Sequence, residues 1–158
     1  KTSVADELAA RGHPVVHLSD TVERYVIERD PIRDTLVVDV ERWAAEFTPR
    51  DGIVEGHLAH YLPCDRIIVL RCRPDVLKSR LNSRAYEIMK VRENIEAEAL
   101  DVILIETLEQ HPVEHVFELD TTSLTIQEIT ERIEEFIEGK LPPRHGTIDW
   151  SEYLVQEI

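Results

Sequence analysis

Short apolar runs alternate with amphipathic segments along this chain. Four of the runs predict strands, at Pro14–Leu18, Gly52–Val54, Arg66–Leu70 and Val113–Leu119, and Thr35–Asp39 is a further apolar run. Segments whose apolar side chains recur every three or four positions predict helices at Val4–Ala10, Thr21–Ile27, Val40–Phe47, Asp75–Arg84, Lys90–His111 and Ile126–Ile137. Strands that alternate with helices predict an α/β fold, with a mostly parallel sheet and helices on both faces.

Capping residues mark the ends of several predicted helices. Gly12 is a good residue to close the first helix, and Ser19 or Asp20 can cap the helix expected at 21–27. Pro74 suits a helix start, where its missing N–H is not needed. After Gly139–Pro143, which reads as a linker, the segment 145–158 is expected either to pack back on its own domain or to dock on a partner.

Composition and charge narrow the class of protein. The chain has 158 residues and a net charge of −14, which disfavours broad binding to a nucleic-acid backbone but allows a local pocket lined by arginines. The sequence contains no apolar run of the roughly 20 residues that span a bilayer and no signal-peptide core. Its two cysteines, Cys64 and Cys72, do not suggest a disulfide framework, so we expect a cytoplasmic protein that does not bind membranes.

Candidate chemistry gathers where predicted strands end, which is where open α/β sheets bind ligands. Glu55 and His57 follow one strand, and Arg71 and Arg73 follow the next. The arginines could bind phosphate or pair with local acids. Zinc binding by Glu55, His57 and His60 is a further alternative, although their spacing does not match the helical H-E-x-x-H pattern. The acidic run 93–98 reads as the solvent face of a helix.

The predicted helix after Asp75 carries two further arginines. Arg80 and Arg84 are four positions apart, so they are expected to share one helix face. Their guanidinium groups suit phosphate oxygens, although a solvated basic stripe is the alternative.

The chain begins Lys1-Thr2-Ser3 and runs directly into a helix. A P-loop has the form G-x-x-x-x-G-K-[ST] between a strand and a helix. Lys1 could therefore be a P-loop lysine, with the first strand and the P-loop glycines absent from this chain. On this interpretation we expect roughly fifteen further residues upstream.

An ordered set of segments resembles the small atypical adenylate kinases, the archaeal relatives of adenylate kinase isoenzyme 6, also called CINAP. The segments are Lys1–Ser3, Val15–Asp20, Ile53–His57, Val69–Arg71, Arg80–Tyr86 and Lys90–Glu98, and Gly146–Leu154 looks like the archaeal branch. The resemblance implies a P-loop nucleoside monophosphate kinase domain over 1–138. It places a mononucleotide-binding segment at about 18–36, a short lid at about 83–93, and a linker and tail at 139–158.

The resemblance also implies roles for individual residues. Lys1, Thr2 and Ser3 would hold ATP phosphates, and Thr2 with Glu55 would hold Mg²⁺, directly or through water. Lys1, Glu55, His57 and Arg84 would be catalytic. The residues of the AMP subsite would be Asp20, Gly56 and His57.

Other implied roles fall in the second half of the chain. Asp120, Thr121 and Thr122 would surround the donor adenine, and Arg84 would also bind ATP from the lid. Arg80 and Tyr86 would have secondary roles. The glycine of the family's Arg-Gly-Tyr motif is Ala85 here, which is expected to stiffen the start of the lid.

The resemblance implies an enzyme that transfers the γ-phosphoryl group of ATP to AMP, with Mg²⁺ as cofactor, and that also hydrolyses ATP. It implies an alternative as well: a nucleotide-dependent assembly factor for the small ribosomal subunit, active in rRNA maturation. The partner in that case would be the eleventh small-subunit ribosomal protein, and the net charge of −14 suits a basic partner.

Overall fold

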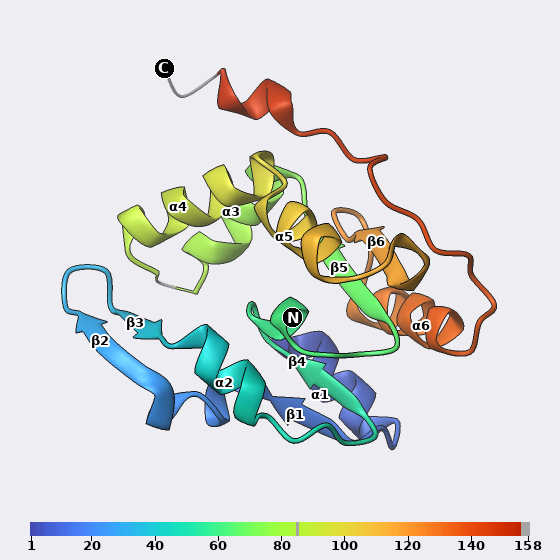
Figure 1. Cartoon of the computed structure of the whole chain (residues 1–158). Coiled ribbons are helices and arrows are strands. Elements are labelled where there is room, and N and C mark those ends of the chain that lie inside the picture. Colours follow the sequence, from blue (N-terminus) through green and yellow to red (C-terminus); the bar gives the residue numbers. More distant parts are fainter. Residues whose placement is uncertain (85, 156–158) are drawn as a thin grey trace. The chain divides into compact units, whose positions relative to one another are not determined.

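The protein is described by a computed structural model covering residues 1–84 and 86–155. Its contacts divide the chain into two compact units, residues 1–64 and residues 65–158 (Figure 1). Each unit contains a pair of parallel strands with helices. The α/β class with parallel strands, predicted from the alternating pattern, is therefore confirmed.

In the first unit, β1 (Val15–His17) and β4 (Ile53–Glu55) run parallel. Helix α1 (Thr2–Ala10) packs against both strands and buries Val4, Ala5 and Leu8. Gly52 brings the chain close to the start of β1, because a Cβ atom built there would lie 2.6 Å from the carbonyl oxygen of Pro14. Only glycine fits this approach without a shift of the backbone.

The prediction of a helix at Thr21–Ile27 is wrong. The segment contains the 3-10 turns η1 (Leu18–Asp20) and η2 (Glu23–Tyr25), and the chain then enters strand β2 (Val26–Asp30). Strand β2 pairs antiparallel with β3 (Thr35–Val38) in a hairpin. The β-branched pair Val26 and Ile27 fits a strand, and cross-strand pairing outweighs the weak helical pattern.

The rest of the first unit closes a small core. Helix α2 (Val40–Glu46) begins at Asp39, whose carboxylate accepts a hydrogen bond from the backbone N–H of Arg42. Turn η3 (Ala59–Tyr61) follows β4. The buried side chains of this core are Leu18, Tyr25, Trp43 and Leu62.

In the second unit, β5 (Ile67–Arg71) and β6 (Val116–Asp120) form the parallel pair. Turn η4 (Val113–His115) precedes β6. Helix α6 (Ile126–Ile137) begins with a capping box made by Thr125 and Glu128, and its Phe136 ring stacks on Phe117 of β6 with centroids 4.8 Å apart. The predicted helix at 126–137 is thus confirmed.

The prediction of a single helix over Lys90–His111 is also wrong. The structure has α4 (Ile88–Ala99) and α5 (Val102–Gln110), separated by Asp101 in a left-handed conformation with φ of +56°. The sequence gives no sign of this break, because apolar side chains recur at helical spacing on both sides of it. An ion pair between Asp101 and Arg71 accompanies the turn, so tertiary contacts outweigh the helical periodicity.

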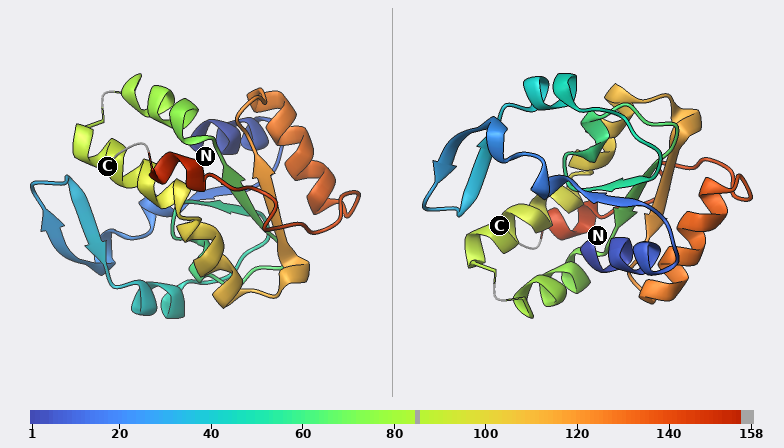
Figure 2. Two further views of the ribbon diagram at one scale, coloured as in Figure 1. Left: turned by 90° about the horizontal axis from the view of Figure 1, so that it is seen from above. Right: turned by 90° about the horizontal axis from the view of Figure 1, so that it is seen from below.

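Helix α3 (Pro74–Asn82) precedes α4, and the C-terminal segment returns to α4 through the 3-10 turn η5 (Ser151–Leu154). Figure 2 shows η5 beside α4. Packing of the tail on its own domain, one of the two alternatives from the sequence, is therefore what the structure shows. Within residues 1–84 and 86–155, no helix is long and apolar enough to cross a membrane.

Candidate functional site

The first predicted site residues lie at the N-terminus of α1. Lys1 precedes the helix, its carbonyl oxygen accepts the first helical hydrogen bond from the Ala5 N–H at 2.9 Å, and Thr2 and Ser3 form the first turn. The leading N–H groups of a helix have no partner within it and favour an anion. The start of α1 is thus suited to a phosphate group.

Glu55 ends strand β4 beside a residue that the sequence analysis missed. Its Oε2 atom lies 2.7 Å from Nδ1 of His17, the residue directly opposite on β1. Asp6 lies near the other ring nitrogen, at 3.6 Å from Nε2. The hydrogen bond with the Glu55 carboxylate raises the pKa of His17 above its ordinary 6.5. The available signal in the sequence was a histidine within the apolar run 14–18, which predicts a strand.

The remaining predicted residues of the first unit lie on turns. Strand β4 ends at Glu55, so His57 lies in the following turn and is exposed. Gly56 allows a close approach, since a Cβ atom there would lie 3.0 Å from Cβ of Leu18. Asp20 is exposed at the end of η1 and caps no helix.

The oxygen donors of the first unit fit a hard divalent cation. Thr2 offers a hydroxyl, and Glu55 keeps its Oε1 atom available because His17 bonds to Oε2. Magnesium prefers such ligands and commonly retains several waters. Across the part of the chain that the structure describes, no group of three or more His, Cys, Asp or Glu side chains is arranged to hold a metal ion, so zinc gains no support.

In the second unit the structure brings together Arg80 and the predicted loop 120–122. The Arg80 guanidinium donates to the carbonyl oxygens of Thr121 and Thr122, at 3.1 and 3.3 Å. The Asp120 carboxylate accepts hydrogen bonds from the backbone N–H and the hydroxyl of Thr122. These contacts hold the loop in place. Because its guanidinium donates to the loop, Arg80 does not belong to a fully solvated basic stripe.

Arg84 and Tyr86 lie beyond α3. The helix ends at Asn82, so Arg84 does not share a helical face with Arg80, and that expectation is wrong. Arg84 is exposed, and Tyr86 is exposed with the Lys90 ammonium 5.4 Å from its ring centroid. Ala85, where the sequence departs from the family motif, lies outside the described residues.

Arg71 pairs with acids instead of facing solvent. Its guanidinium, 3% exposed, contacts the carboxylates of Glu98, Asp101 and the fully buried Glu118. Of the two alternatives for this arginine, local pairing is the one observed, and Arg73 likewise pairs with Asp75.

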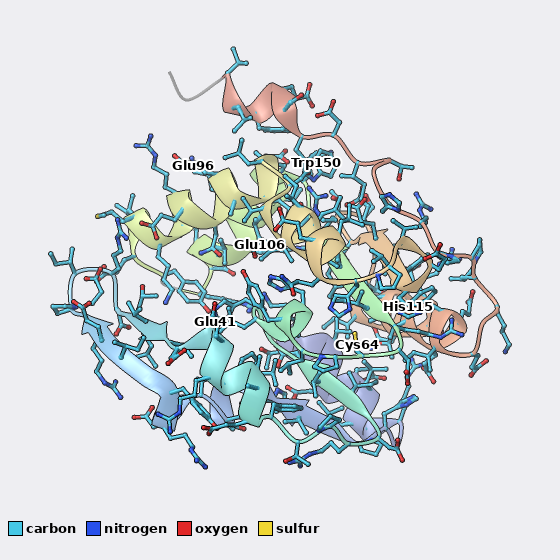
Figure 3. The ribbon with its side chains drawn as sticks, viewed as in Figure 1. Glu41, Cys64, Glu96, Glu106, His115 and Trp150 are labelled. Carbon is cyan, nitrogen blue, oxygen red and sulfur yellow. The ribbon has the colours of Figure 1, made fainter. Side chains whose placement is uncertain are left out.

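The acidic run 93–98 was interpreted as the solvent face of a helix, and this interpretation is wrong at Glu98. Its side chain is largely buried, and burial raises its pKa against the opposing effect of Arg71. Trp150 of the tail, labelled in Figure 3, donates its indole N–H to Glu98 Oε1 at 3.1 Å. A pocket of about 210 Å³ lies close by, lined by Arg92, Ile95, Glu96, Ala99, Leu100, Tyr153 and Leu154.

Comparison with known proteins shows which family this chain resembles in sequence. The family described as "AAA domain" matches residues 1–101. Archaeal proteins named "Putative adenylate kinase" match over nearly the whole chain. The one from Natronomonas pharaonis is 40% identical, over 96% of this chain and 92% of its own length. The one from Archaeoglobus fulgidus is 42% identical, over 100% of this chain and 89% of its own.

Proposed function

The chain belongs to the AAA domain family and to the archaeal family whose members carry the adenylate kinase name, and we propose that it is an adenylate kinase. The proposed reaction is ATP + AMP giving two ADP. The γ-phosphorus of ATP leaves its bridging oxygen on ADP and bonds to a phosphate oxygen of AMP. The finer assignment, to the relatives of adenylate kinase isoenzyme 6, is part of this proposal.

One observation carries the proposal: the Lys1-Thr2-Ser3 helix start and the Glu55 strand end belong to elements that pack together. Transfer of a phosphoryl group needs positioning and charge neutralisation more than covalent participation. Lys1 and the first turn of α1 would bind phosphate oxygens. His57 and Asp20 would serve the AMP side, with Gly56 admitting a close backbone approach.

Magnesium is the implied cofactor, and Thr2 and Glu55 would hold it, directly or through water. When bound, it neutralises developing charge on the β- and γ-phosphates. His17 would hold the Glu55 carboxylate in one orientation through the 2.7 Å hydrogen bond, leaving Oε1 for the cation or its water.

The second unit would supply the remaining contacts to ATP. The loop Asp120, Thr121 and Thr122, which Arg80 pins, would lie against the donor adenine. Arg84, exposed beyond α3, would bind phosphate oxygens through its guanidinium fork. Tyr86 follows it and would have a secondary role.

A coupled assay of ADP production tests the proposal. We expect ADP formation to require AMP, ATP and Mg²⁺ together, and ATP hydrolysis without AMP to be slower. Glu55→Gln should weaken the Mg²⁺ dependence and lower turnover, whereas Glu131→Gln, a change of the same chemistry on α6, should not. Hydrolysis of ATP with no phosphorylation of AMP would overturn the kinase assignment.

A second function, as a nucleotide-dependent assembly factor for the small ribosomal subunit, is favoured by one observation. The net charge of −14 complements a basic ribosomal protein such as the eleventh protein of the small subunit. Pull-down of that protein with and without ATP tests it. Retention that does not depend on nucleotide, or that is lost at moderate salt with any basic protein, would contradict this function.

A further inference from the structure

The C-terminal tail contacts a largely buried carboxylate of the second unit through the side chain of Trp150. The indole N–H of Trp150 donates to Oε1 of Glu98, a largely buried carboxylate near the end of α4. Trp150 also meets the ring of Tyr153 edge-on, with centroids 6.4 Å apart. The tail is therefore attached to α4 by a directional polar contact as well as by packing.

The same oxygen of Glu98 holds the carboxyl end of β5. It accepts from Nε of Arg71 at 2.6 Å and lies 3.3 Å from the backbone nitrogen of Cys72. Three donors from two distant parts of the chain thus converge on one atom. Glu98 therefore links the tail to the carboxyl end of β5.

The end of β5 in turn fixes the loop assigned to the donor adenine. The Arg71 carbonyl oxygen accepts from both the backbone N–H and the hydroxyl of Thr121, each at 2.8 Å. The Arg73 N–H donates to the hydroxyl of Thr122 at 2.9 Å. The two residues that flank Cys72 therefore hold the loop by its backbone and hydroxyl groups.

A second contact from the tail reaches the same cluster. The backbone N–H of Gly146 donates to Oε1 of Glu118 at 2.6 Å, and the other oxygen of Glu118 accepts from Arg71. Arg144 extends the β6 edge by hydrogen bonds with Val116 and Glu118. The tail is thus connected to the Arg71 guanidinium from two directions.

We propose that Trp150 is a positioning residue for the donor nucleotide, acting through Glu98 and Arg71 on the loop Asp120–Thr122. Its indole contacts Glu98 and the ring of Tyr153, so its effect on the loop would pass through the Glu98 carboxylate. This inference rests on the proposed function for the assignment of the loop to the adenine. Removing the indole N–H should weaken ATP binding and leave AMP binding unchanged.

The test uses Trp150→Phe, which removes the donor and keeps an aromatic ring. We expect the dissociation constant of a non-hydrolysable ATP analogue and the KM for ATP to rise about fivefold, the lower end of coupling between linked sites, with the KM for AMP unchanged. Leu154→Ala is the matched control, because it loosens the tail at the α4 pocket without removing the Glu98 contact. It should leave the KM for ATP near the wild-type value.

Two further measurements separate positioning from a general loss of structure. In the Glu98→Met background, which lacks the oxygen that accepts from the indole, Trp150→Phe should add little, because both changes act along one path. In a Trp43→Phe protein, Trp150 is the remaining tryptophan of the chain, and its fluorescence should change when the ATP analogue binds. Additive effects, or fluorescence that does not respond to a bound analogue, would overturn the inference.

The outcomes also distinguish this inference from the proposed function. If the wild-type protein phosphorylates AMP and Trp150→Phe binds the ATP analogue normally, the inference fails and the function stands. If the wild type binds the analogue but does not phosphorylate AMP, a weaker affinity in Trp150→Phe supports the inference while the function fails. A wild type that binds no ATP analogue overturns both.

Discussion

Nδ1 of His17 and Oε2 of Glu55 lie 2.7 Å apart at the carboxyl ends of two parallel strands. The strand register places the two residues directly opposite each other, so the backbone pairing fixes the contact. An imidazole that holds one carboxylate oxygen leaves the other for a cation or water. The hydrogen bond holds the Glu55 carboxylate in one orientation, unlike that of a mobile surface acid.

We expect the pKa of His17 to be above its ordinary 6.5 in the folded protein, because Glu55 stabilises the imidazolium. The contribution of this pair to stability is then complete below the pKa of the unfolded chain. It is lost as the pH rises through the raised pKa of the folded state. An NMR titration of the imidazole in magnesium-free buffer measures the shift.

Glu55→Gln is the control for this titration, since the amide keeps an acceptor but carries no charge. The pKa of His17 should fall toward 6.5 in that variant. An unchanged titration curve would show that Glu55 does not govern the imidazole.

The His17–Glu55 contact shows where the sequence was sufficient and where it was not. The place of Glu55 at the end of a strand was predictable, because the apolar run before it is local. His17 was missed because its role depends on which strand lies beside β4 and in which register. The hairpin of β2 and β3 was missed for a related reason: pairing between segments decides it, while the local pattern of 21–27 suggests a helix.

Arg84→Ala should lower turnover about 100-fold, the scale of losing one group that stabilises transition-state charge. The side chain is exposed beyond α3, so stability should change little. Steady-state kinetics with ATP and AMP measures the effect. Arg132→Ala removes another exposed guanidinium, from α6, and should keep wild-type turnover. Turnover within a factor of about two of wild type for Arg84→Ala would remove this residue from the site.

Arg71→Met should destabilise the protein by about 3–5 kcal/mol, because it leaves buried carboxylates without their cation. Glu118 has no exposed side-chain surface, and Glu98 is largely buried. Urea denaturation gives the free energy of unfolding. Arg132→Ala, the surface control, should change it by less than about 0.5 kcal/mol. A loss below about 1 kcal/mol for Arg71→Met would show that the carboxylates rearrange toward other donors or solvent.

The buried Arg71 cluster was open to two interpretations in the sequence because burial is a property of tertiary structure. An arginine at a strand end looks the same whether a phosphate or a carboxylate faces it. Its acidic partners Glu98, Asp101 and Glu118 lie 27 to 47 positions away along the chain. The strands β5 and β6 themselves were predictable, since their apolar runs are local.

Gly52→Ala should destabilise the first unit by about 3 kcal/mol, from backbone strain and a weakened hydrogen bond. Gly52 has φ of +127°, and the added Cβ would lie 2.6 Å from the Pro14 oxygen that accepts from the Ile53 N–H. Gly12→Ala is the control: its φ is +97°, but nothing lies within 4 Å of the new atom, so it should cost only about 1 kcal/mol. Urea denaturation of both variants isolates the clash, and equal losses would mean that the approach to Pro14 relaxes freely.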